Sequence, residues 1–263
     1  MTLREAIRVY LLLALSQAVA APQALAQSDN PQGQGNMSAR LSAERLSDVQ
    51  PGEYNAGDQD FILGAYGDKY LMRLGPGREC YVLYADRAAL GGRVLKYDSG
   101  ATALKVSVWG GITLYTHDAP GGVPATRVGD LPAMPAAAVT VAQLTEALAD
   151  ETRHLAYVAR YTPRFTVDAS VLSGDDNAHA LAFDALVNTE AGLEKLLSTN
   201  IGRMAVTRRI DTVRIIEGSK ATIRLSGKTL LVSFVPANGL AGRASSRAIA
   251  FALGKLLSVE QPA

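Results

Sequence analysis

The stretch Trp109-Gly110-Gly111-Ile112-Thr113-Leu114-Tyr115-Thr116 decides the fold, because it ends a run of short strand-like segments that begins near Phe61. These segments are rich in β-branched and aromatic residues, and turn residues such as Gly67-Asp68 and Asp98-Ser99-Gly100 separate them. Because every connection is short, neighbouring strands should be antiparallel. The region from 51 to 130 is therefore predicted to be an antiparallel β-meander.

The hairpin at Gly110-Gly111 indicates how this sheet is covered. A two-residue turn there would place Trp109 opposite Ile112. Because side chains alternate along a strand, both faces of the hairpin would then be largely apolar. A sheet with one solvated face shows a clean alternation instead. We therefore expect a curled sheet or small barrel, with helices from the C-terminal half on its outside.

The C-terminal half, from 139 to 260, has the pattern of a helix-rich α/β domain. A Pro/Ala-rich linker from Leu131 to Ala138 marks the boundary. Thr140 and Gln143 form a capping box that begins a helix over 141–157. Strand and helix patterns then alternate up to a final helix over 247–257. The predicted fold class is α+β, and the sequence leaves open whether the two halves share one core.

The N-terminus has the order of a secretory signal. Arg4 and Arg8 precede a short apolar run, and Ala24-Leu25-Ala26 is an A-x-A cleavage site, with Ala18-Val19-Ala20 as an earlier alternative. The run is shorter than the roughly 20 residues that span a membrane. We therefore expect a signal peptide over 1–26, a disordered leader and short helix over 27–50, and a periplasmic or secreted protein without a transmembrane segment.

Charge and cysteine content narrow the function classes. The net charge is +1, and a chain this close to neutral lacks the basic face that a nucleic-acid-binding protein needs. Cys80 is the single cysteine, so no internal disulfide can form. Its place in a predicted strand favours a small buried side chain over a nucleophile.

The sequence contains no recognisable catalytic motif. It has neither a G-x-S-x-G elbow nor an S-x-x-K motif nor a phosphate-binding P-loop. The three histidines, His117, His154 and His179, are far apart and lack paired-ligand spacing. We therefore predict no catalytic residue, no metal and no cofactor.

Two groups of residues are candidates for ligand binding. In the first, a glycine-containing loop leads through Arg243, Ser245, Ser246 and Arg247 into the last helix. The free N–H groups of a helix N-terminus bind anions, and arginines recognise carboxylate or phosphate. The alternative is a serine N-cap with surface arginines.

The second group comprises Trp109, Tyr115 and His117. These side chains lie around the Gly-Gly turn and could line a groove for a ligand or a partner. Packing beside a tight turn is the alternative.

Several glycine-containing motifs resemble a family of exported alphaproteobacterial proteins of unknown function. They are Glu79–Leu83, Tyr97–Gly100, Gly110–Thr116, Gly121–Ala125 and Gly239–Ser246. Ala244 departs from the family pattern, in which a proline is expected. The resemblance implies export and a Gram-negative setting, and it implies no catalytic residues.

These observations favour a non-enzymatic envelope protein that binds a protein partner or a small anionic ligand. The alternative is a hydrolase or transferase that acts on a cell-envelope polymer, with a site assembled across the two halves. A third possibility, a structural assembly subunit, would need a large exposed apolar patch.

Overall fold

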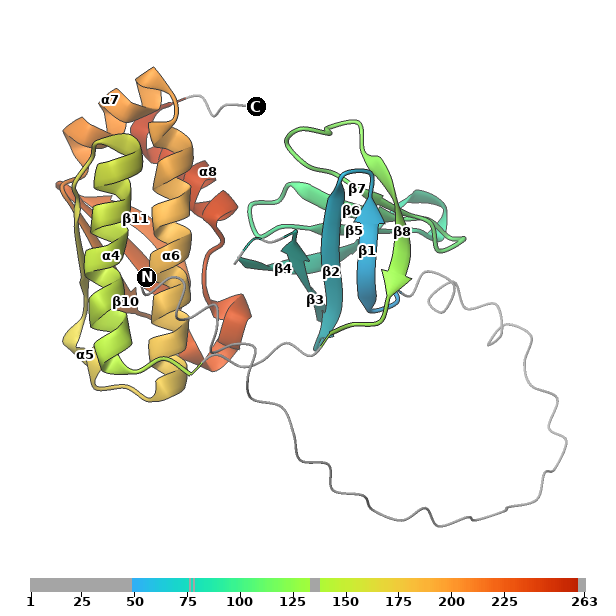
Figure 1. Ribbon diagram of the computed structural model, residues 1–263, viewed down its shortest axis with the longest axis horizontal. Helices are drawn as coiled ribbons and strands as arrows, with labels where there is room; N and C mark the ends of the chain where they lie inside the picture. Colours follow the sequence, from blue (N-terminus) through green and yellow to red (C-terminus); the bar gives the residue numbers. More distant parts are fainter. Residues whose placement is uncertain (1–48, 76, 78, 133–137, 260–263) are drawn as a thin grey trace, which may run out of the picture. The chain divides into compact units, whose positions relative to one another are not determined.

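The computed structural model describes residues 49–75, 77, 79–132 and 138–259. It confirms the α+β class, with an antiparallel closed barrel in the N-terminal half and a helix-rich C-terminal half that has its own sheet (Figure 1). The predicted signal peptide, nearly all of the leader and most of the Pro/Ala linker lie outside the described residues. The described residues before and after the linker belong to one compact unit.

The barrel is an up-and-down meander of eight strands in sequential order, closed by pairing of the first strand with the last. The strands are β1 Gly52–Ala56, β2 Gln59–Tyr66, β3 Lys69–Leu74, β4 Cys80–Arg87, β5 Arg93–Lys96, β6 Thr102–Val106, β7 Ile112–Leu114 and β8 Val123–Gly129. The predicted two-residue turn at Gly67-Asp68 is confirmed, because Tyr66 pairs with Lys69. The interior is filled by alternate side chains that include Phe61, Leu63, Met72, Leu83, Leu95, Leu104 and Leu114.

The predicted register of the β6–β7 hairpin is wrong. Val106, not Trp109, pairs with Ile112, and residues 107–111 form the turn. Leu104 therefore lies opposite Leu114 on the buried face, while Lys105 and Thr113 share the outer face. In the paired part of the hairpin, buried apolar residues therefore alternate with more exposed polar ones, as in a sheet with one solvated face. The expectation of helices over the outer face rested on two apolar faces, and that premise is wrong.

The two strands that close the barrel do not have a clear sequence pattern. Strand β1 lies before Phe61 and β8 follows Thr116, so both fall inside the predicted β region but outside the run of strand-like segments recognised in the sequence. In the short β1, Glu53 and Asn55 alternate with the buried Tyr54 and Ala56, whereas in β8 Thr126, Arg127 and Val128 are exposed in succession. Their pairing arises from barrel closure, which supplies partners to backbone groups whatever the side chains are.

The C-terminal half combines helices with a second, four-stranded sheet in the order β11-β12-β10-β9. Its elements are α4 Val141–Ala159, β9 Arg164–Val167, α5 Ala169–Leu172, α6 Asp176–Leu197, α7 Asn200–Arg209, β10 Thr212–Glu217, β11 Thr222–Ser226, β12 Thr229–Phe234, a 3₁₀ segment η2 Pro236–Gly242 and α8 Ser246–Leu257. The capping box at Thr140 and Gln143 is confirmed. The alternation of apolar residues from Phe165 to Val171 favours a strand over that whole stretch, but β9 ends at Val167 and Ala169 begins α5.

Helices α4 and α6 lie side by side, and α8 packs against α6 (Figure 1). A second hydrophobic core forms between these helices and the sheet, separate from the barrel interior. Leu144, Leu186, Val213, Val232 and Ile249 are among its fully buried members. The two halves therefore have two cores, and polar contacts join residues of one half to residues of the other.

Candidate functional site

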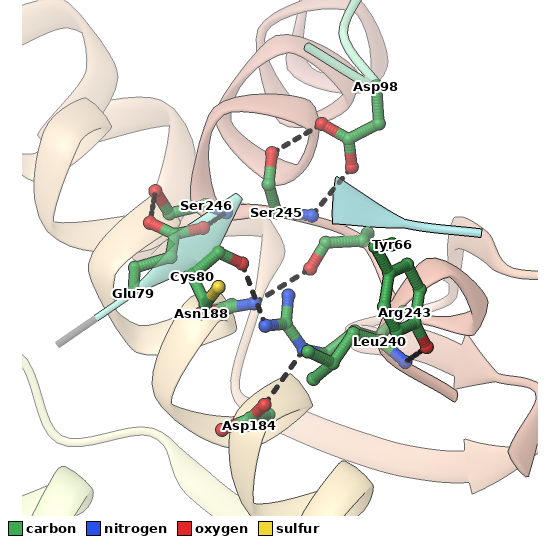
Figure 2. A network of polar contacts seen from close by, with 11 residues as sticks. Tyr66, Glu79, Cys80, Asp98, Asp184, Asn188, Leu240, Arg243, Ser245 and Ser246 are labelled. Atoms are coloured by element: carbon green, nitrogen blue, oxygen red, sulfur yellow. Dashed lines mark hydrogen bonds and ion pairs between the residues drawn. The ribbon is translucent and has the colours of Figure 1, made fainter. Parts of the chain in front are cut away.

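The N-terminus of α8 is the centre of the polar contacts between the two halves (Figure 2). Ser245 caps the helix by accepting a hydrogen bond from the Ala248 N–H group at 3.1 Å. Its own N–H and hydroxyl groups donate to the Asp98 carboxylate at 2.7 and 2.5 Å. The N–H and hydroxyl groups of Ser246 donate to the Glu79 carboxylate at 2.7 and 2.5 Å. The helix N-terminus therefore contacts anionic groups, and these are carboxylates of the barrel.

Arg243 is the second part of the same network. Its side chain is 2% exposed, its Nε donates to Asp184 at 3.0 Å, and its Nη2 donates to the carbonyl oxygen of Cys80 at 2.9 Å. Burial raises the pKa of the Asp184 carboxyl, whereas the adjacent guanidinium acts in the opposite direction. The charge of Arg243 is thus matched within the protein, because a buried cation requires such a partner.

Arg247 and Lys195 flank this helix end and contact groups of the protein. The guanidinium of Arg247 lies 4.4 Å from the centre of the Tyr97 ring, a cation–π contact. Lys195 donates to the Ser246 hydroxyl at 2.8 Å. The structure brings all four predicted residues to one helix end, and each contacts another group of the protein. They are Arg243, Ser245, Ser246 and Arg247.

Backbone contacts hold the loop before α8 in place. The side-chain amide of Asn188 donates to the Ala244 carbonyl at 3.0 Å, and the Leu240 N–H donates to the Tyr66 hydroxyl at 3.1 Å. Gly239 has a φ of 53°, and a Cβ atom there would lie 2.4 Å from that hydroxyl. Only glycine permits both the left-handed backbone and this close approach.

The structure does not unite the second predicted group. Trp109 lies in the turn before β7, whereas Tyr115 and His117 follow the strand, so β7 separates them. Tyr115 is half-buried beneath Lys105, whose Nζ atom is 4.8 Å from the ring centre, and His117 is exposed. Packing accounts for Tyr115, while Trp109 remains 91% exposed.

Trp109 instead belongs to a rim formed by two neighbouring hairpins. Arg87 pairs with Arg93, Arg93 with Val106, and Val106 with Ile112, so these four residues form one row across β4, β5, β6 and β7. The turns 88–92 and 107–111 both leave this row at the same end of the barrel. Leu90 in the first turn is 94% exposed. We call Leu90, Trp109, Arg87 and Arg93 the barrel rim.

The barrel rim is apolar at its tips and basic at its base. The adjacent carboxylate, Asp86, forms an ion pair with Lys96 at 2.7 Å. Within the described residues, neither Arg87 nor Arg93 has an ion pair with a carboxylate. Arg87 and Arg93 lie directly opposite each other, and like charges in that arrangement destabilise a sheet. A negative group outside the protein that bound both arginines would relieve their repulsion.

The remaining candidates for chemistry are distributed over separate elements. Burial raises the pKa of the Cys80 thiol, which is half-buried, in spite of the nearby Arg243. His179 is buried on α6, with its Nδ1 atom 3.9 Å from Asp176. His154 lies on α4 beside two carboxylates of α6.

Within the described residues, no helix is long and apolar enough to cross a membrane.

Comparison with known proteins shows that the chain belongs to the family described as Domain of unknown function (DUF4908), which matches residues 36–253. No curated protein and no solved structure matches the chain. The matched range contains the barrel, the C-terminal sheet and the first two thirds of α8. The family match therefore spans both halves of the chain.

Proposed function

We propose that this member of a family of unknown function is an exported envelope protein that binds an anionic lipid surface through the barrel rim, without catalysing a reaction. The observation that supports this most is the near-complete exposure of two large apolar side chains, Leu90 at 94% and Trp109 at 91%, on adjacent hairpins. Tryptophan is enriched at membrane–water interfaces, where its ring is apolar and its N–H is hydrated.

The backbone of Leu90 supports a role for its exposed side chain. Its φ of 61° and ψ of 23° are left-handed, a conformation that residues other than Gly, Asn and Asp rarely adopt. A leucine there gains no burial and has an unfavourable backbone. Strain of this kind is concentrated at binding sites.

The charges at the base of the rim define the surface that it would meet. Each arginine near an anionic leaflet contributes about 1 kcal/mol to binding, and full burial of a leucine side chain contributes roughly 1.5–3 kcal/mol. Arg87, Arg93, Leu90 and Trp109 together would therefore give weak, reversible and salt-sensitive docking. Such binding suits a protein that associates peripherally with a membrane.

The end of α8 is a poorer site for a small anionic ligand. An external anion would have to displace the Asp98 and Glu79 carboxylates, each of which accepts two hydrogen bonds at 2.5–2.7 Å. The hydroxyl of Ser246, a residue that is 1% exposed, points at Glu79, so a substrate could not reach it without a rearrangement. These contacts favour lipid binding at the rim over a hydrolase centred on α8.

The proposal is tested by co-sedimentation with vesicles. The protein without residues 1–26 should sediment with vesicles of phosphatidylglycerol and phosphatidylcholine, and not with phosphatidylcholine alone. A Leu90→Ser, Trp109→Ser double variant should lose this binding. An Arg87→Gln, Arg93→Gln variant should reduce it, and added salt should weaken the wild type.

Matched controls come from α7. Ile201 and Met204 are exposed apolar residues there, and Arg208 and Arg209 are an exposed basic pair. Serine at the first two positions, or glutamine at the last two, should leave sedimentation unchanged. Equal loss in the control variants, or no binding by the wild type, would contradict lipid docking.

Export is tested separately by expression in a Gram-negative host. The N-terminal sequence of the protein recovered from the periplasm should begin at Gln27, after Ala26, or at Ala21 if the earlier site is used. Recovery of the uncleaved chain from the cytoplasm alone would contradict export.

A further inference from the structure

His154 on α4 and two glutamates on α6 form a cluster between the paired helices. The Nε2 atom of His154 lies 3.4 Å from Glu190 Oε1 and 3.8 Å from Glu194 Oε2. One ligand atom of each residue can be chosen so that all three lie within 4.8 Å of one another. Glu190 and Glu194 are one helical turn apart, so both project from the same face of α6.

These separations fit a shared metal ion. Zinc is bound by imidazole nitrogen and carboxylate oxygen at about 2.0–2.1 Å, so ligand atoms of a tetrahedral site lie about 3.4 Å apart. The distance between His154 Nε2 and Glu190 Oε1 is 3.4 Å, and it exceeds the usual N–H···O range of about 2.7–3.2 Å. The distance to Glu194 requires only a small side-chain adjustment.

Ligand type and access favour the same interpretation. The side chain of Glu190 is 6% exposed, while those of His154 and Glu194 are 24% and 48% exposed. The cluster combines one imidazole with two carboxylates, which are ligand types that divalent transition metals accept. The exposed side of the cluster, at Glu194, would admit such an ion together with water.

We propose that His154, Glu190 and Glu194 bind a divalent transition-metal ion. A nitrogen ligand with two carboxylate oxygens is a donor set of zinc, manganese and iron sites. A bound ion would cross-link α4 to α6 within the C-terminal half. The site is independent of the barrel rim, so either proposal can fail while the other holds.

The test is calorimetric titration of the chelator-treated chain, without residues 1–26, with Zn²⁺ near neutral pH. We expect one ion per chain and a higher melting temperature in its presence. His154→Gln and Glu194→Gln should each weaken affinity at least about tenfold, which is the lower end of what even outer-shell partners contribute. Glu194 is half-exposed, so its variant should fold if the His154 variant does not.

The controls are substitutions of the same type elsewhere in the chain. His117→Gln changes an exposed histidine in the β7–β8 loop, and Glu146→Gln changes an exposed glutamate on α4 itself. Both should bind Zn²⁺ as the wild type does. Absence of stoichiometric binding by the wild type, or equal binding by the Glu194→Gln variant, would overturn the proposal.

Discussion

Glu79 of the barrel accepts two hydrogen bonds from Ser246, one from the backbone N–H at 2.7 Å and one from the hydroxyl at 2.5 Å, across 167 positions of the chain. Asp98 accepts the equivalent pair from Ser245. The free N–H groups and the dipole of α8 both favour negative charge at this position. The helix end therefore acts as an internal anion site that connects the two halves of the protein.

Glu79→Gln should destabilise the fold by about 1–3 kcal/mol, because an acceptor of two charge-assisted hydrogen bonds is replaced by a group that accepts one and adds a donor. Chemical denaturation measures the free energy of unfolding. Glu146→Gln, at an exposed position of α4, should change it by less than about 0.5 kcal/mol. Equal stability of the two variants would show that the Glu79 contact contributes nothing.

Arg243→Lys should be much more costly than the same substitution at Arg214. Both arginines donate through Nε to an aspartate, but the Arg243 side chain is 2% exposed and that of Arg214 is 53% exposed. Lysine cannot reproduce the contacts to both Asp184 and the Cys80 carbonyl, so we expect a loss of about 3–5 kcal/mol, as when a buried ion pair is broken.

The Arg214→Lys variant provides the comparison, since exposed ion pairs contribute about 0–1 kcal/mol. The same denaturation experiment applies to both variants. A loss at Arg243 no larger than the loss at Arg214 would mean that its buried ion pair is not formed in solution.

Leu90→Asn should stabilise the fold and weaken vesicle binding together. Asparagine tolerates the left-handed backbone that costs a leucine roughly 1–2 kcal/mol, and Leu90 loses no buried contacts because it is 94% exposed. The melting temperature should rise while co-sedimentation falls. Leu131→Asn, at an exposed leucine without a positive φ, should do neither. Lower stability of the Leu90 variant would exclude strain at this position.

The Cys80 thiol should react slowly with a disulfide reagent near pH 8, and faster as the pH rises. Burial raises its pKa above the ordinary value, so less thiolate is present than in the unfolded chain. Its contribution to stability is therefore complete below the unfolded pKa and is lost as the pH rises through the folded pKa. Urea should accelerate the reaction at pH 8, and an equal rate without urea would contradict the burial.

The barrel was only partly predictable from the sequence. Short strand-like segments and glycine turns predicted all the strands from β2 to β7, because local pairing determines hairpins of this kind. The register at Gly110-Gly111 could not be inferred, since a turn of two or five residues contains the same glycines. The closing pair of β1 and β8 joins segments about 75 positions apart, a contact with no local signal.

The candidate sites show the same division between local and distant information. Ser245 and Ser246 were recognisable as a helix start, because capping is local. Glu79 and Asp98, which occupy that helix end, lie in a separate half and carry no pattern that links them to it. His154 and Glu190 meet only through the packing of α4 on α6. Leu90 was overlooked because an apolar residue before two glycines resembles part of an ordinary loop.

The fluorescence of Trp109 tests the central claim most directly, because it is the single tryptophan of the chain. Its 91% exposure predicts an emission maximum typical of a hydrated indole for the free protein. If the barrel rim docks on lipid, phosphatidylglycerol-containing vesicles should shift this emission to shorter wavelength, and the Arg87→Gln, Arg93→Gln variant should need more lipid to reach the same shift. Emission that stays unchanged as such vesicles are added in excess would contradict the account.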